Sequence, residues 1–307
     1  MGYDPAVLPV EERLSLELRS LYHSKGCRLY RMSKFEEYDF YARNKDFLMS
    51  DSVITFTDVG GKLMALRPDV TLSIVRGSGD ALPGLRKLFY HENIYRPSDH
   101  GGPFRELPQV GVEFQGAVDR GALRDCLSLA VGSLALLSPE YRLRLSHLDL
   151  TARLLDALEL SPEDRQRAVI CIGAKNRSGL EELCRAAGAD GTAIGKLSQL
   201  MGFSGPPDSV LPSVRALCPG DAAADELERV TSGLPNISID FSIAGNLNYY
   251  NGIVFEGYVS FAPSRVLSGG QYDGLMRKLG RRDSAVGFAV YLDQLDRLPE
   301  EGGWGKL

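Results

Sequence analysis

NLNYYNGIVFEGYVSFAPSRVLSGGQYDG, residues Asn246–Gly274, joins a strand-like segment to a glycine-rich one. From Leu247 to Val259, β-branched and aromatic residues dominate, a composition typical of a half-buried strand. Asn251-Gly252 fits either a tight turn or a glycine inside a continuous strand, because the alternation runs on through it. In Ser268–Gly274 three glycines surround a tyrosine and an aspartate, and glycine lets backbone and ligand approach closely. The stretch predicts either an aromatic-walled slot for a small ligand or a core strand followed by a glycine-rich turn.

The bulk properties are those of a globular chain without a membrane or nucleic-acid signature. Its 307 residues are 44% hydrophobic and 24% charged, with a formal net charge of -5, which argues weakly against a large basic surface. The longest apolar run, Leu127–Leu137, is too short to span a bilayer, and the chain does not open on a signal peptide. We expect a cytoplasmic protein.

The cysteines and histidines indicate neither disulfides nor a metal site. Five cysteines occur without any CxxC pair, and the four histidines lack metal-ligand spacing. We therefore expect free thiols, no metal and no cofactor. The residues are Cys27, Cys126, Cys171, Cys184, Cys218, His23, His91, His100 and His147.

The order of patterns predicts an α+β fold interrupted by helices. A helix from Pro9 to Gly26, a hairpin over Val53–Leu66 and strands over Leu85–Tyr95 and Arg105–Gly116 open the chain. Between residues 151 and 235 the texture becomes Ala-, Leu- and Glu-rich, which predicts a helical insertion. The expected division is 1–150 for the first part of the core, 151–235 for the insertion and 236–307 for the second part, where Ala285–Leu295 is a strand running into a helix.

The strand Arg105–Gly116 carries a glutamate where it is not expected. Val110, Val112 and Phe114 alternate with Gln109 and Glu113, so the two sets lie on opposite faces. Such a glutamate either faces solvent, the more common outcome, or lines a pocket.

Four collinear blocks resemble the histidyl-tRNA synthetase-like branch of the class II aminoacyl-tRNA synthetases. The resemblance implies a mostly antiparallel sheet flanked by helices, a helical insertion, and dimerisation through the N-terminal region. The blocks are FTDVGGKLMALRPDVT (Phe56–Thr71), LFYHENIYRP with FRELPQVGVEFQG (Leu88–Gly116), NLNYYNGIVFE with SGGQYDGL (Asn246–Leu275) and AVGFAVYLDQL (Ala285–Leu295).

By this resemblance the amino-acid pocket of the family is largely kept. It implies that carboxylates hold the α-amino group and imidazole of histidine, which is consistent with the strength of charge-assisted hydrogen bonds. Arg67 or Arg96 is the possible contact for the α-carboxylate. The positions that match the histidine-binding pocket are Asp69, Thr71, Gln109, Glu113, Tyr250 and Tyr272.

The groups that activate histidine with ATP in this family are changed. Gly245 stands where the family has an arginine that stabilises the reacting charges, and Gln294 stands where an arginine clamps ATP. Tyr291 replaces a glycine, and its ring is expected to fill part of the nucleotide site. The altered positions are Gly245, Asn248, Ser98, Tyr291 and Gln294.

The pattern as a whole resembles the regulatory subunits of ATP phosphoribosyltransferase. Only Asp296–Leu307 follow the last block, so no anticodon-binding domain is expected, and neither is tRNA binding. The resemblance implies a non-catalytic subunit that activates a short-form catalytic subunit, with L-histidine as feedback inhibitor. Two alternatives remain: a divergent adenylating or aminoacylating enzyme, and an amino-acid-sensing scaffold with another partner. Phe35–Phe47 and the helical insertion are the candidate partner surfaces.

Overall fold

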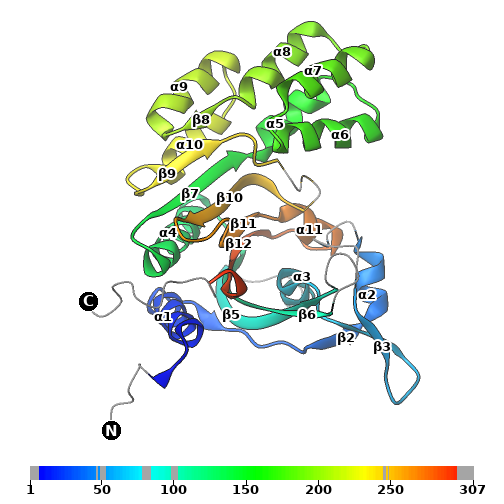
Figure 1. Cartoon of the computed structure of the whole chain (residues 1–307), viewed down its shortest axis with the longest axis vertical. Coiled ribbons are helices and arrows are strands. Elements are labelled where there is room, and N and C mark those ends of the chain that lie inside the picture. Colours follow the sequence, from blue (N-terminus) through cyan, green and yellow to red (C-terminus); the bar gives the residue numbers. More distant parts are fainter. Residues whose placement is uncertain are drawn as a thin grey trace.

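The computed structural model describes residues 7–45, 48, 53–77, 84–97, 103–244, 247 and 249–295, and within them a nine-stranded mixed sheet forms the centre (Figure 1). Neighbouring strands are antiparallel except in the pairs β1–β5 and β7–β9, which confirms the predicted mostly antiparallel sheet. In spatial order the strands are β1 (Arg28–Leu29), β5 (Leu85–Arg96), β6 (Arg105–Gly116), β12 (Ser284–Tyr291), β11 (Leu267–Gln271), β10 (Asn251–Val259), β7 (Tyr141–His147), β9 (Ile237–Asp240) and β8 (Ser204–Gly205).

A second, three-stranded sheet contains the predicted hairpin. The order of its strands is β2-β4-β3, and the turn between β3 and β4 is held by Asp58, whose Oδ1 accepts hydrogen bonds of 2.8 Å from the backbone N–H groups of Gly60 and Lys62. The segment after residue 34 forms β2 and a short helix. The bounds are β2 (Phe35–Glu37), α2 (Tyr38–Arg43), β3 (Thr55–Thr57) and β4 (Leu63–Leu66).

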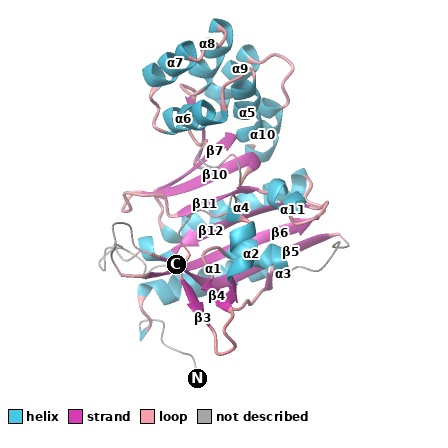
Figure 2. Cartoon of the chain, turned by 90° about the vertical axis from the view of Figure 1, so that its right-hand side faces the viewer, coloured by secondary structure: helices cyan, strands magenta, loops and turns pink. Residues whose placement is uncertain are grey.

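Two helices cover one face of the large sheet, whose strands β7, β10, β11, β12, β6 and β5 follow one another in this order in Figure 2. Helices α1 (Val10–Ser24) and α4 (Arg120–Leu137) pack on Val110, Val112 and Phe114 of β6, which form part of the main apolar core. Helix α3 (Val70–Gly77) packs on the opposite face, in a separate cluster with alternate residues of β5. The alternation in β6 thus sorts its side chains as predicted.

Six helices, α5 to α10, follow β7 at one end of the molecule (Figure 1). The short strand β8 lies between α8 and α9 in the chain. Helices α5 to α8 share an apolar cluster, whereas α9 and α10 pack into the main core. Asp240 of β9 is 1% exposed and connects these parts, because it binds Arg144 of β7 and Lys175, the latter at 2.9 Å. The bounds are α5 (Leu148–Asp156), α6 (Pro162–Gly173), α7 (Arg177–Ala186), α8 (Gly191–Leu200), α9 (Pro207–Leu217) and α10 (Ala223–Thr231).

The glycine-rich segment is a strand rather than the turn that one interpretation predicted. Gly269 and Gly270 lie in β11, where a Cβ would come within 2.3 Å and 2.8 Å of neighbouring atoms, so these glycines allow tight packing. Gly252 lies within β10 at a bulge, with a φ of 55°. Helix α11 (Asp273–Lys278) follows β11, and β12 ends in the short 3-10 helix η4 (Leu292–Gln294).

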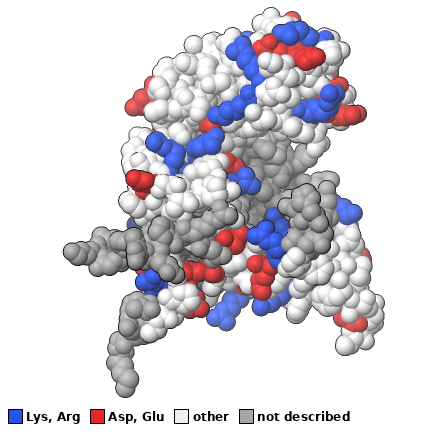
Figure 3. Space-filling view, in the orientation of Figure 1, with Lys and Arg blue, Asp and Glu red and all other residues white. Residues whose placement is uncertain are grey.

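Basic and acidic side chains are interspersed on the face shown in Figure 3. All five cysteines are free. Within the described ranges, no helix is long and apolar enough to cross a membrane, and no cluster of His, Cys, Asp and Glu has the arrangement of a metal site.

Candidate functional site

A cavity of about 570 Å³ lies on the face of the large sheet opposite α1 and α4. Residues before and in α3, on β5 and β6, on β10 to β12 and in η4 line it, so the strands that meet here are far apart in sequence. Such a volume is typical of small-molecule sites. The cavity brings together all six positions that match the histidine-binding pocket: Asp69, Thr71, Gln109, Glu113, Tyr250 and Tyr272.

Glu113 is a buried carboxylate held by neutral donors. It is 1% exposed, and it accepts hydrogen bonds from Thr71 Oγ1 at 2.5 Å and from Tyr272 Oη at 2.6 Å. Gly287 of the neighbouring strand β12 pairs with Glu113, and a Cβ at Gly287 would lie 1.9 Å from Glu113 Oε2. Burial raises the pKa of Glu113 to about 8, against the two hydrogen bonds, which lower it. The site therefore favours a cationic group or a proton beside this side chain.

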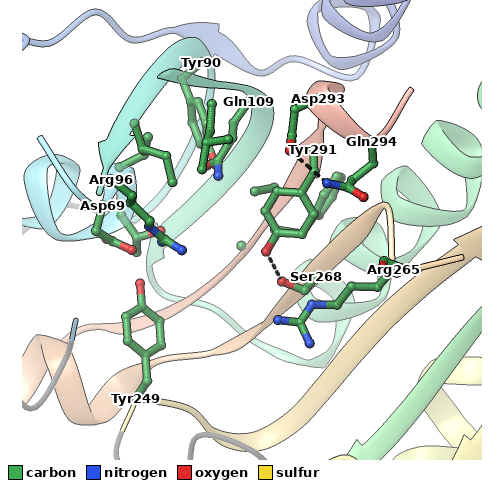
Figure 4. A pocket seen from close by; sticks show the side chains of 18 of the residues that line it. Asp69, Tyr90, Arg96, Gln109, Tyr249, Arg265, Ser268, Tyr291, Asp293 and Gln294 are labelled. Atoms are coloured by element: carbon green, nitrogen blue, oxygen red, sulfur yellow. Dashed lines mark hydrogen bonds between the residues drawn. The ribbon is translucent and has the colours of Figure 1, made fainter. Parts of the chain in front are cut away.

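Asp69 is the second carboxylate, and it also caps helix α3. Its Oδ1 accepts a hydrogen bond of 2.8 Å from the backbone N–H of Leu72 in the first turn of α3. Burial raises the pKa of Asp69, while the Leu72 N–H, the positive charge of Arg96 and the Tyr249 hydroxyl oppose the shift. In Figure 4 the Tyr249 hydroxyl points toward Asp69 and Arg96.

Tyrosines form the wall beside these carboxylates. The ring centroids of Tyr249 and Tyr250 lie 4.6 Å apart, and those of Tyr249 and Tyr272 lie 6.4 Å apart. Burial raises the pKa of each of these phenols well above its ordinary value, so they remain hydrogen-bond donors at neutral pH.

Tyr90 is a wall residue that the sequence analysis missed. It is 1% exposed and sits opposite Gly111 in the register of β5 and β6. A Cβ at Gly111 would lie 2.4 Å from the Tyr90 hydroxyl. The sequence signal was this glycine inside an otherwise apolar strand, which indicates that a neighbouring group approaches closely.

The two arginines proposed for the α-carboxylate have different positions. Arg67 is fully buried outside the cavity lining, where its Nη2 donates to Glu92 Oε2 at 2.8 Å and its Nη1 to Ser33 O at 2.8 Å. Its guanidinium is thus committed to the fold. Arg96 lines the cavity beside Asp69, and its Nε is buried without a hydrogen-bond partner among the described residues. We call Asp69, Thr71, Glu113, Arg96, Tyr249 and Tyr272 the inner end of the cavity.

The opposite part of the cavity is polar, and its charges are balanced. Gln294 Nε2 donates to Asp293 Oδ2 at 2.8 Å, and Arg105 lies 3.5 Å from the same carboxylate. Arg265 forms an ion pair of 2.9 Å with Glu256. We call Arg105, Arg265, Ser268, Asp293 and Gln294 the outer end.

Of the five positions at which this chain differs from the synthetase pattern, two lie among the described residues. Tyr291 and Gln294 line the cavity, with Tyr291 between the two ends (Figure 4). Gly245, Asn248 and Ser98 lie outside the described residues. Arg105, Arg265, Ser268 and Asp293 had not been named as site residues. Arg265 lies in the loop before β11, and only the tertiary structure places it at the cavity.

The raised pKa of Glu113 predicts a pH-dependent stability. The folded state holds this proton up to about pH 8, whereas an unfolded glutamate loses it near its ordinary value of 4.5. The free energy of unfolding should therefore fall as pH rises from about 5 to 8, by the order of a few kcal/mol. Urea titrations at pH 5, 6.5 and 8 measure this, and Glu113→Gln should flatten the dependence. An equal slope in the wild type and the variant would contradict it.

Comparisons with known proteins agree on one family. The family model described as histidyl-tRNA synthetase matches residues 3–295. The ATP phosphoribosyltransferase regulatory subunit of Thermoanaerobacter pseudethanolicus is 30% identical over 269 residues, which cover 83% of this chain and 70% of the relative.

Solved structures share the fold. One is an ATP phosphoribosyltransferase regulatory subunit/histidyl-tRNA synthetase from Bacillus halodurans, with 25% identity, a TM-score of 0.81, and coverage of 96% of this chain and 80% of that one. Another is the ATP phosphoribosyl transferase (HisG:HisZ) complex from Thermotoga maritima, with 18% identity, a TM-score of 0.70, and coverage of 92% and 97%.

Proposed function

The chain belongs to the histidyl-tRNA synthetase family, in its branch of ATP phosphoribosyltransferase regulatory subunits, and from this membership we propose how it acts. It is the subunit that activates a short-form catalytic subunit in the first step of L-histidine biosynthesis, and it carries inhibition by histidine. The observation that supports this is the inner end of the cavity, where two buried carboxylates and an arginine line the same space.

The charges of the inner end complement a histidine molecule. Asp69 is placed to accept hydrogen bonds from the α-ammonium, and Glu113 to bind the imidazole. Arg96 is the candidate for the α-carboxylate, because Arg67 is occupied by Glu92. Thr71, Gln109, Tyr250 and Tyr272 supply further polar contacts and the aromatic wall.

The same cavity is poorly equipped for adenylate formation. An arginine fork matches phosphate geometry, whereas Gln294 is neutral and donates to Asp293. Tyr291 occupies space between the two ends of the cavity. We therefore propose that the subunit is non-catalytic and does not charge tRNA, and that it acts in the cytoplasm as a hetero-oligomer whose own dimer forms through the N-terminal region.

Inhibition requires that histidine distinguish assembly states. A ligand with equal affinity for the active and inactive states shifts no equilibrium, so the inner end must bind histidine more tightly in the inactive assembly. Two sites coupled in this way influence each other reciprocally, and the catalytic subunit should in turn change the histidine affinity measured here.

The direct test mixes the two subunits. Formation of phosphoribosyl-ATP should appear only when both are present, and L-histidine should suppress it. A control measures histidine- and ATP-dependent pyrophosphate exchange by this protein alone. This exchange should be absent, because Gln294 stands where the family has the arginine that clamps ATP.

An inactive mixture together with exchange by this protein alone would overturn the proposal in favour of an adenylating enzyme. An inactive mixture without exchange, in a protein that still binds histidine, would instead favour an amino-acid sensor with another partner.

A further inference from the structure

Tyr291 stands across the cavity and is anchored there. It is the last residue of β12, and its hydroxyl lies 2.5 Å from Ser268 Oγ on the neighbouring strand β11. Ser268 pairs with Ala289, two residues before Tyr291, so the two side chains project from the same face of the sheet. In Figure 4 the ring lies between Asp69, Arg96 and Tyr249 on one side and Arg265 on the other.

The Tyr291 hydroxyl interacts with groups on both sides of the ring. Toward the inner end, burial and then the nearby Tyr291 oxygen raise the pKa of Tyr250. Toward the outer end, burial lowers the pKa of Arg265, but the oxygens of Tyr291 and Glu256 more than offset this. Tyr291 therefore occupies the boundary between the two ends, held by polar contacts as well as by its strand.

The direction of Arg96 shows which part of a bound amino acid would meet this ring. Its guanidinium points from Asp69 toward the space in front of Tyr291 (Figure 4). An α-carboxylate held by Arg96 would lie in that space, so any substituent on the carboxyl carbon would extend toward Tyr291.

We propose that Tyr291 is a specificity-determining residue that closes the way from the inner to the outer end and restricts the cavity to free amino acids. The inference rests on the proposed function, because it takes histidine as the ligand of the inner end. Ligands extended through the carboxyl group, such as amides or esters, are excluded by the volume of the ring. Strand β12 fixes the position of the ring, and the hydrogen bond to Ser268 is an additional contact of its hydroxyl.

The charged side chains of the outer end are paired with opposite charges, which is consistent with a part of the cavity that binds no ligand. Its two arginines are paired with carboxylates, Arg105 with Asp293 and Arg265 with Glu256. A phosphate group entering there would have to compete with both acids. Removing the ring alone should thus admit a neutral extension more readily than a nucleotide.

The test compares two ligands by calorimetry: L-histidine and L-histidine β-naphthylamide, which carries a bulky neutral substituent on the carboxyl carbon. Wild-type protein should bind the first and show no measurable binding of the second. In Tyr291→Ala the amide should bind at least about tenfold more tightly than in the wild type, with histidine affinity changed less than about threefold. Tyr291→Phe keeps the ring and should still exclude the amide.

Two further variants control for misfolding and for effects of a substitution outside the cavity. Tyr291→Val suits a β-strand and replaces Tyr291→Ala if the latter fails to fold. Phe104→Ala removes an exposed ring outside the cavity lining and should leave both ligands unaffected.

The outcomes separate this inference from the proposed function. If histidine binds but Tyr291→Ala and Tyr291→Val exclude the amide as the wild type does, the inference is wrong and the proposed function stands. The same holds if the wild type already binds the amide. If the wild type binds no histidine, both are overturned.

Discussion

Glu113→Gln should weaken L-histidine binding by about 10- to 150-fold at neutral pH. A hydrogen bond to a charged group contributes about 1.5–3 kcal/mol, and about 1.4 kcal/mol corresponds to a factor of ten in affinity. Glutamine keeps the size of the side chain and its contacts with Thr71 and Tyr272, but it has no proton to transfer. It therefore cannot form the carboxylate–imidazolium pair that Glu113 forms when it passes its proton to the bound imidazole. Isothermal calorimetry on the free subunit measures the effect.

Glu106→Gln is the matched control for this substitution. Glu106 lies on the same strand, β6, but it is exposed and outside the cavity lining, where it accepts a hydrogen bond of 2.9 Å from Tyr95. Its replacement should change histidine affinity less than about twofold, since surface changes away from a site have small effects. Unchanged affinity in Glu113→Gln would show that Glu113 does not anchor the ligand.

Arg67→Met should lower the free energy of unfolding by about 3–5 kcal/mol, the usual cost of breaking a buried ion pair from one side. The guanidinium is fully buried, and its loss leaves Glu92 and the carbonyl oxygens of Ser33 and Asn93 without their donor. Methionine is of comparable length and limits the cavity that the substitution creates. Urea denaturation with a constant m-value is the appropriate measurement.

Arg43→Met provides the comparison in an exposed ion pair. Arg43 is 79% exposed and lies 3.8 Å from Asp39, so its loss should cost no more than about 1 kcal/mol. The double variant Arg67→Met/Glu92→Gln should recover part of the loss, because no unpaired charge then remains near the interior. If Arg67→Met were as mild as Arg43→Met, the ion pair of Arg67 with Glu92 would not be a main contribution to the stability of the fold.

Periodicity in the sequence determined the elements and the faces of the strands. Val110, Val112 and Phe114 had to share one face of β6, with Gln109 and Glu113 on the other, because side chains alternate along any strand. The N-terminal helix, the hairpin and the helical texture between residues 151 and 235 were predictable for the same local reasons, although the domain boundaries drawn there remain a prediction. The resemblance to a family then named the pocket positions.

Only the tertiary structure decided what each polar face meets. Whether Glu113 faces solvent or a cavity depends on Tyr272 and Gly287, which are more than 150 residues away in the sequence. Arg67 and Arg96 are chemically equivalent in the sequence, and the ion pair with the partly buried carboxylate of Glu92 assigns Arg67 to the fold and leaves Arg96 at the site. Local patterns fix the direction of a side chain, but its partner and its charge state depend on burial and on charges brought together from distant segments.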